Sequence, residues 1–312
     1  MADIRKVATR QSYGEALVEL GAAHDDFVVL DADLAAATQT GKFKAAYPDR
    51  FIDVGVAEQN LMGVAAGIAT TGHRVFASTF AMFAAGRAFE QVRNSIGYPH
   101  LHVVIGATHA GMSVGEDGAT HQCNEDLALM RAIPGMTVIV PADDVEAKAA
   151  VRAAYEAEGP VYVRLGRLPV PVIHKDDYHF ELGRGVVERE GSDVTVIACG
   201  LEVPAALEAA KTLAAKGVSC EVINMATIKP LDGDLIVASA RKTGRVVTVE
   251  EHSVIGGLGS AVCDLLCEAC PTPVKKIGVN DVFGESGPAL DLLAKYGLDG
   301  AGVAEAIEGF VR

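Results

Sequence analysis

The chain has 312 residues, half of them hydrophobic, which is enough for two domains with cores of their own. Lys and Arg number 27 against 41 Asp and Glu, so the net charge of −14 argues against nucleic acid and anionic membranes as partners. Residues 1–6 carry charges where a signal peptide needs an apolar run, and no uninterrupted apolar stretch reaches about 18 residues. We therefore expect a cytoplasmic protein.

Residues 1–168 alternate short apolar segments with helical patterns. We expect helices over 9–20, 57–70 and 80–96, and strands over 27–30, 51–54, 75–77, 101–107, 137–140 and 161–165. Short apolar strands between helices are typical of a parallel sheet that is covered on both faces.

A linker is expected over 169–184, where Pro169 and Pro171 favour extended chain and polar residues follow. A second alternating set then fills 185–312, with strands expected over 194–198, 218–223, 245–249 and 274–279 and a helix over 202–216. The sequence therefore predicts an α/β protein of two domains, each a mostly parallel sheet with helices on both faces.

Three cysteines of the second domain, Cys263, Cys267 and Cys270, fall on one face of an expected helix. No second cysteine or histidine pair stands at metal-ligand spacing. We expect buried thiols here, with a redox or metal role as the alternative.

In open parallel sheets, ligands bind beyond the carboxyl ends of the strands, so loops that directly follow strands matter most. One such loop leads to Glu58, at the start of a helix whose other residues are mostly small or apolar. The glutamate is either a simple helix-dipole carboxylate or a buried acid held against a ligand. Another strand ends before Phe80 and Phe83, which either pack in the core or stack on a flat ring.

The loop 108–122 is rich in polar chemistry. It contains three glycines, two histidines (His109 and His121) and the acid Asp117. Long glycine-rich loops inside compact domains are usually functional. A metal site built from these three side chains is possible, although no helical histidine pair supports it.

Arg164 and Arg167 follow the last strand of the first domain, and Arg10 lies near its start. They are either surface charges or a phosphate-binding group at one sheet edge. Known nucleotide motifs are missing, since the run Gly257-Leu258-Gly259 lacks the third glycine of the dinucleotide fingerprint.

These groups, in this order and spacing, resemble the pyrimidine-binding domain of transketolases, and the second domain resembles the transketolase C-terminal domain. The segments that carry the resemblance are 53–67, 78–83 and Gly-Glu-Asp-Gly-Ala-Thr-His-Gln at 115–122, the last being highly specific. The resemblance implies a thiamine-diphosphate enzyme that transfers a two-carbon ketol unit between a ketose phosphate and an aldose phosphate.

The resemblance also implies roles at the cofactor. Glu58 matches the glutamate that hydrogen-bonds the aminopyrimidine ring and so activates the cofactor. Phe80 and Phe83 match the aromatic pocket for that ring, and Asp33 matches an acid near the cofactor.

Further roles concern the substrate. His109 and His121 match histidines that contact substrate hydroxyls and assist proton transfer. Asp117 matches an acid that reads a sugar hydroxyl, and Arg10 and Arg167 match the arginines that bind the sugar phosphate.

The chain departs from the family in two respects. A serine that helps to hold the phosphate is Ala37 here, although Thr38 follows it. The diphosphate-binding domain, with its G-D-G…N motif for Mg²⁺, is missing before the pyrimidine domain. We therefore expect a separate partner subunit that binds the diphosphate and Mg²⁺, an assembly of two chains of each kind, and no activity from this chain alone.

Two related activities remain as alternatives. Segments 53–59 and 250–260 look similar to 1-deoxyxylulose-5-phosphate synthases, which usually have an arginine where His109 stands. The other alternative is the β subunit of a 2-oxoacid dehydrogenase, which does not usually show the 115–122 pattern.

Overall fold

A seven-stranded sheet forms the centre of the first half of the computed structural model, which describes residues 5–312. Residues 1–4, part of the charged start considered above, lie outside the described part. In spatial order the strands are β12 (Thr227–Lys229), β6 (Thr137–Ile139), β7 (Val161–Arg164), β5 (Val103–Thr108), β4 (Arg74–Phe80), β2 (Phe27–Asp31) and β3 (Phe51–Asp53). All pairs are parallel except β12 with β6.

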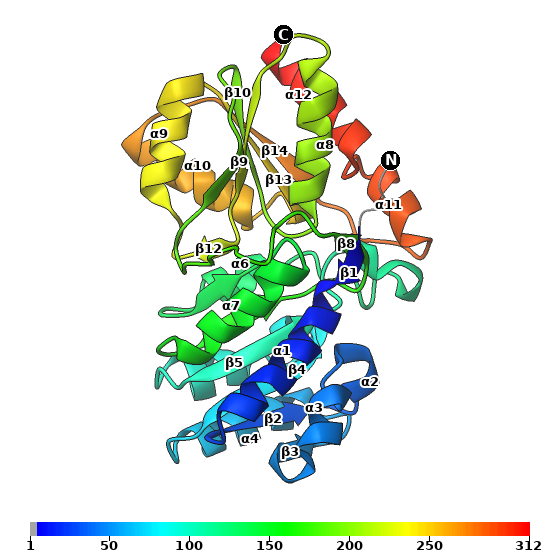
Figure 1. Ribbon diagram of the computed structural model, residues 1–312, viewed down its shortest axis with the longest axis vertical. Coiled ribbons are helices and arrows are strands. Elements are labelled where there is room, and N and C mark those ends of the chain that lie inside the picture. Colours follow the sequence, from blue (N-terminus) through cyan, green and yellow to red (C-terminus); the bar gives the residue numbers. More distant parts are fainter. Residues whose placement is uncertain (1–4) are drawn as a thin grey trace.

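Helices cover both faces of this sheet, as the sequence predicts (Figure 1). One face carries α1 (Thr9–Ala23), α3 (Gly41–Ala46) and α7 (Asp144–Glu156), packed through a core that includes Tyr13, Phe27 and Phe76. The other face carries α4 (Glu58–Ala69), α6 (Asp126–Arg131) and the helical segment 82–97, which contains α5 (Phe89–Gln91). The short α2 (Ala35–Thr38) lies after β2.

The expected helix over 80–96 is wrong at its start. Strand β4 continues to Phe80, which pairs with Thr108 of β5, and its last six residues are all buried. Most of the helical segment that follows consists of π-helical turns, at Met82–Arg87 and Val92–Gly97. The longer strand moves the Phe80 side chain to the carboxyl edge of the sheet, where ligands bind.

A five-stranded sheet forms the centre of the second half, in the order β14 (Val274–Val279), β13 (Val246–Ser253), β10 (Val194–Ala198), β11 (Cys220–Asn224) and β9 (Val186–Arg189). Only the edge strand β9 is antiparallel. Helices α8 (Glu202–Ala214) and α12 (Gly300–Val311) pack on one face, and α9 (Gly233–Thr243) and α10 (Leu258–Ala269) on the other. Both halves thus have the predicted α/β architecture.

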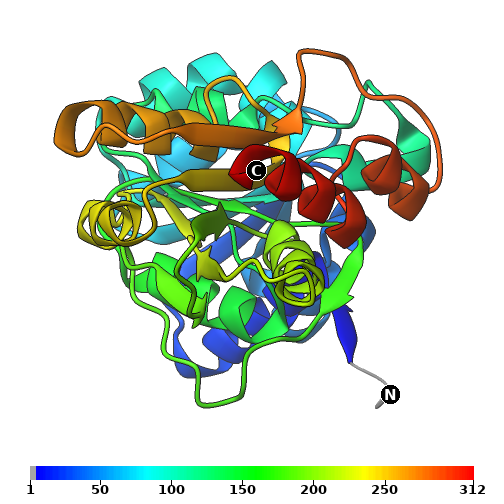
Figure 2. The same cartoon turned by 90° about the horizontal axis from the view of Figure 1, so that it is seen from above.

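Residues 280–288 connect β14 to α11 (Ala289–Lys295). Figure 2 shows this segment, in orange, arching outward before the chain enters α11 and α12, in red. Helix α11 packs against the turn Met112–Asp117 of the first half. The C-terminal half therefore reaches the loop that carries the predicted substrate residues.

Three features join the two halves. Strand β12 leaves the second half and pairs with β6 of the first sheet. Strand β1 (Lys6–Ala8) pairs with β8 (Pro169–Pro171), inside the segment expected to be a linker. One hydrophobic cluster also spans the junction, with Leu127 and Met130 of α6 and Leu258 and Leu266 of α10.

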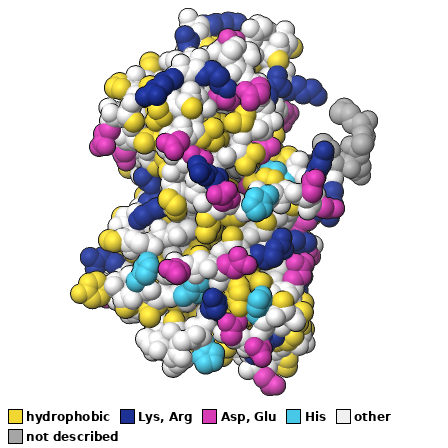
Figure 3. Space-filling view, turned by 60° about the vertical axis from the view of Figure 1, so that its left-hand side comes forward, with side chains coloured by type: hydrophobic (Ala, Val, Ile, Leu, Met, Phe, Trp, Pro, Cys, Tyr) yellow, Lys and Arg dark blue, Asp and Glu magenta, His cyan; other side chains and the backbone are white. Residues whose placement is uncertain are grey.

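The surface has no dominant charge of one sign on the face in Figure 3, where acidic and basic side chains are interspersed. None of the helices in residues 5–312 is long and apolar enough to cross a membrane.

The expectation of buried thiols is wrong for Cys267, which is exposed, while Cys263 and Cys270 are half-buried. Helix α10 buries Leu258 and Leu266 in the core, whereas Cys267 is exposed on it; Cys270 lies just beyond its end and packs against the same core.

Candidate active site

Five of the predicted residues meet at the carboxyl edge of the first sheet. The ring of Phe80 stacks on the imidazole of His109, with centroids 3.9 Å apart, and Arg10 Nη1 lies 3.4 Å from His109 Nε2. Phe83 stacks with Phe80 at 5.8 Å and meets the ring of His121 edge-on at 5.5 Å. The end of β4, the helical turn after it, the loop after β5 and the start of α1 therefore form one continuous aromatic and basic surface.

Glu58 opens α4 and is only 3% exposed. Its Oε2 atom has no hydrogen-bond partner among the described residues, and Arg87 Nε lies 3.9 Å from it. A buried carboxylate oxygen without a donor is costly unless a ligand supplies one. The Glu58 carboxylate therefore fits a ligand that presents a hydrogen-bond donor.

Arg87 connects Glu58 to the aromatic pair, because its guanidinium also lies over the ring of Phe83 at 5.8 Å. This arginine was not predicted, because an exposed arginine within a helix belongs to no motif. Its distance of four residues from Phe83 and its place on the same helical segment were the only available signals.

His109 is an uncharged imidazole at neutral pH. Burial lowers the pKa of His109 to about 3, and the charges of Arg10 and Arg167 act in the same direction. Because a guanidinium can only donate, Nε2 of His109 is assigned as the acceptor toward Arg10, and Nδ1 carries the proton 2.9 Å from Thr108 Oγ1. The ring can thus accept a proton at Nε2 but does not act as a standing cation.

The loop after His109 is shaped by glycines in the left-handed region. Gly111, Gly115 and Gly118 have φ angles of 76°, 79° and 74°, which side chains with a Cβ rarely adopt. They flank and interrupt the turn Met112–Asp117 and so turn the Asp117 carboxylate toward Arg167 Nη1, 3.8 Å away. This geometry accounts for the glycine pattern that sequence analysis singled out.

A polar pocket of about 370 Å³ lies between this loop and the start of α1. Arg10 and Arg167 line it together with Gln11, Gln39 and Ser113. Arg167 Nη1 also lies 3.1 Å from the exposed Glu116 carboxylate. Two arginines and two amides at one pocket are suited to an anion such as a phosphate.

Ala37 helps to hold Arg10 at this pocket, since its carbonyl oxygen accepts a hydrogen bond of 2.8 Å from Arg10 Nη1. The hydroxyl of Thr38 does not replace the family serine. It points inward and donates to Asp31 Oδ2 at 2.7 Å. Asp31, which sequence analysis missed, is fully buried and also binds the hydroxyl of Thr40 and the amide of Leu34.

Arg164 does not line the polar pocket, so the prediction that it joins Arg10 and Arg167 in one phosphate-binding group is wrong. It is buried, binds Asp126 Oδ2 at 2.8 Å and donates to the backbone oxygen of Glu251 at 2.9 Å. Its strand β7 directs it into the junction between the two halves, whereas Arg167, three residues later, reaches the surface.

Asp33 is exposed after β2, with φ at 61°, and its backbone amide donates to Asp53 Oδ1 at 3.0 Å. No hydrogen bond or ion pair within residues 5–312 joins its side chain to the other predicted residues. The open possibility of a metal site at His109, His121 and Asp117 is not supported, because these side chains do not form a metal-binding cluster in the described chain.

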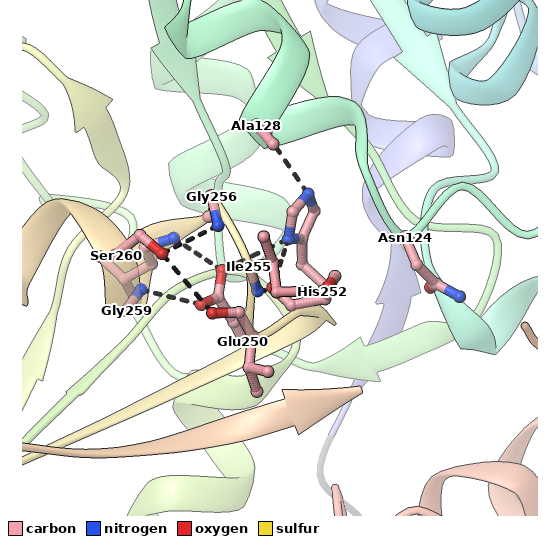
Figure 4. Close-up of polar contacts among 12 residues, drawn as sticks. Asn124, Ala128, Glu250, His252, Ile255, Gly256, Gly259 and Ser260 are labelled. Carbon is pink, nitrogen blue, oxygen red and sulfur yellow. Dashed lines mark hydrogen bonds and ion pairs between the residues drawn. The ribbon is translucent and has the colours of Figure 1, made fainter. Parts of the chain in front are cut away.

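The run Gly257-Leu258-Gly259 has an internal role (Figure 4). Its helix start is occupied by the carboxylate of Glu250, which accepts hydrogen bonds of 2.6 Å from Leu258 N and 2.8 Å from Gly259 N. A Cβ on Gly257 would lie 2.7 Å from His252 Nδ1. The glycine therefore allows close packing and does not form a phosphate loop.

A more open pocket of about 660 Å³ lies beside the aromatic pair. Met82, Phe83 and Arg87 form one side, and Val282 and Phe283 of the arching segment form the other. The site is thus open to solvent next to Phe83 and Arg87 and is bordered by the C-terminal half.

Family comparisons cover most of the chain. Residues 5–172 match the model of the transketolase pyrimidine-binding domain, and residues 183–303 match that of the transketolase C-terminal domain. A protein of Methanocaldococcus jannaschii, provisionally named a transketolase C-terminal section, is 51% identical over 96% of this chain and 94% of its own.

A solved structure described as a split gene transketolase in an inactive beta4 tetramer is 58% identical, with a TM-score of 0.91 over 97% of this chain and 98% of that one. Longer relatives include human transketolase and a 1-deoxy-D-xylulose-5-phosphate synthase of Geobacter sulfurreducens. Each is 38% identical to the chain, which spans 49% and 47% of their respective lengths.

Proposed function

The chain belongs to the transketolase family, and from this premise we propose that it is the pyrimidine-binding subunit of a split transketolase. With a partner subunit it transfers a two-carbon ketol unit from a ketose phosphate to an aldose phosphate. The observation that supports this most is the buried Glu58 carboxylate with an unpartnered oxygen, linked through Arg87 to the Phe83 ring.

Thiamine diphosphate fits these residues, and when bound it supplies the nucleophilic carbon that ketol transfer needs. Glu58 would hold the aminopyrimidine ring by a hydrogen bond, and Phe80 and Phe83 would pack against that ring. Asp33 is proposed as an acid near the cofactor on the strength of the resemblance. Mg²⁺ and the diphosphate would be held by the partner subunit, in a cytoplasmic assembly of two chains of each kind.

The substrate would lie along the basic surface. Arg10 and Arg167 would bind its phosphate in the polar pocket, and Asp117 would read a hydroxyl. His109 Nε2 and His121 would contact hydroxyls and assist proton transfer, with His109 uncharged at neutral pH.

The deciding experiment is reconstitution. The purified chain alone should bind thiamine diphosphate weakly and show no ketol transfer, and mixing it with a diphosphate-binding subunit should restore both. The screen includes pyruvate with glyceraldehyde phosphate and a 2-oxoacid with a lipoyl acceptor, to detect the two alternative activities. Full ketol transfer by the isolated chain would refute the split-enzyme proposal.

Glu58→Gln tests the carboxylate in the reconstituted enzyme. The amide keeps the shape but loses the acidic group, so the rate should fall about 10²- to 10⁴-fold while the fold is retained. Glu156→Gln is the matched control, because it makes the same chemical change at an exposed position at the end of α7. A loss below about tenfold for Glu58→Gln would mean that this glutamate does not activate the cofactor.

A further inference from the structure

The C-terminal half of the chain packs against the loop that carries His109, Asp117 and His121. The side chain of Gln122 donates to the backbone oxygen of Glu285 at 3.0 Å, and the amide of Ser253 donates to the backbone oxygen of Asn124 at 2.7 Å. Helix α11 packs on the turn Met112–Asp117. The C-terminal half therefore holds this loop in place through hydrogen bonds and packing.

One side chain of the C-terminal half contacts the middle of this loop. Glu251, on β13, is 4% exposed, and its Oε1 accepts a hydrogen bond from the backbone amide of Ser113. The contact is close, because a Cβ on Gly111 would lie 2.7 Å from the same oxygen. Arg164 fixes Glu251 in turn, by donating to its backbone oxygen.

We propose that Glu251 is a positioning residue for the proposed ketol-transfer site, acting through the Ser113 amide on the loop between His109 and Asp117. The kinetic part of the proposal rests on the proposed function. The structural part, that the carboxylate holds the loop, concerns the chain itself and can be tested without any activity.

The charge state of Glu251 should make the stability of the closed loop depend on pH. Burial raises the pKa of Glu251 to about 7, against the opposing effects of Arg164 and the Ser113 amide, while the carboxylate of Asp126 adds to the rise. Glu202 of α8 also interacts with it electrostatically. Because burial is the main cause of the raised pKa, the closed loop disfavours the ionised carboxylate, and opening the loop to water relieves that cost. The loop should therefore be held less firmly as pH rises through 7.

Glu250 provides a matched control on the same strand. It is equally buried and also accepts backbone hydrogen bonds, but from Leu258 and Gly259 of α10, away from the loop (Figure 4). Glu250→Gln thus removes a buried carboxylate of the same kind without touching Ser113.

The first test is hydrogen exchange of the loop amides in the isolated wild-type chain and in both Gln variants. Protection of the 110–117 peptide, corrected for intrinsic exchange, should decrease from pH 6 to pH 8 in wild type and in Glu250→Gln, and should stay flat in Glu251→Gln. Equal pH dependence in all three chains would overturn the proposal, whatever the enzyme does.

The second test is steady-state kinetics of the reconstituted enzyme. Between pH 6 and pH 8, wild type should lose about fivefold in kcat relative to Glu251→Gln, with little change in KM, because only wild type gains the buried charge that loosens the loop. Glu250→Gln should keep the wild-type pH profile. A pH profile for Glu251→Gln that matches wild type would overturn the positioning role, and an inactive wild-type mixture would instead count against the proposed function.

Discussion

Replacing His109 by Asn should remove a large part of the acid sensitivity of the fold. Asn tolerates the left-handed backbone of this position, where φ is 57°. The pKa of His109 is lowered by burial to about 3, so the folded chain holds the ring uncharged while the unfolded chain protonates it near its ordinary pKa of about 6.5. Stability from this group is therefore fully present above pH 6.5 and is lost as pH falls toward 3.

The magnitude follows from the linkage between proton binding and folding. Between pH 7.5 and pH 5, only the unfolded chain gains the proton, which lowers the free energy of unfolding by about 2 kcal/mol. Urea unfolding of the isolated chain at both pH values measures this, and the His109→Asn chain should lose about 2 kcal/mol less than wild type. A ring that titrates above pH 6 in NMR, or identical pH dependence of the two chains, would refute the reasoning.

Two further predictions concern the polar pocket that Arg10 and Arg167 line and the segment 169–184 between the two halves. Arg167→Met in the reconstituted enzyme should raise KM for phosphorylated substrates by about tenfold or more, because a charge-assisted contact is lost. In the same assay, KM for unphosphorylated acceptors should not change. Burial alone would lower the pKa of His174, but Asp143 and Glu188 outweigh it and raise the pKa to about 10. The stability that this cation contributes should be fully present below pH 6.5 and should be lost as pH rises toward 10. The free energy of unfolding in urea should therefore decline less with pH over this window in His174→Gln than in wild type, and an equal decline in the two chains would contradict the prediction.

The architecture was largely predictable because apolar runs bounded by polar residues locate buried parallel strands directly. Position-specific details were not. Phe80 was placed in a helix, although the run from Val75 is a strand to its end, because Ser78 and Thr79 look like a helix start in sequence. Strands β9 and β12 were missed since each is short and is fixed by pairing with a distant edge.

The site was predictable where a side chain lies at the end of a strand or in the loop after it and belongs to a motif, as with Glu58, Phe80 and His109. It was not predictable where a function depends on a partner far along the chain. The separation of Arg164 from Arg167 is decided by Asp126 and by the backbone of Glu251, 87 residues beyond Arg164. Spacing in the sequence contains no information on such contacts.

The strand β12 determines how the molecule can come apart. It is the outermost strand of the first sheet although it belongs to the second half, and it covers the edge of β6. Cleavage within 169–184 would break the covalent link between the two halves. If the second half then dissociated, the edge of β6 would be exposed, and an exposed strand edge readily pairs with other chains. Proteolysis or truncation at that segment should therefore yield aggregates or a nicked, still associated pair, and heat should unfold both halves in a single transition.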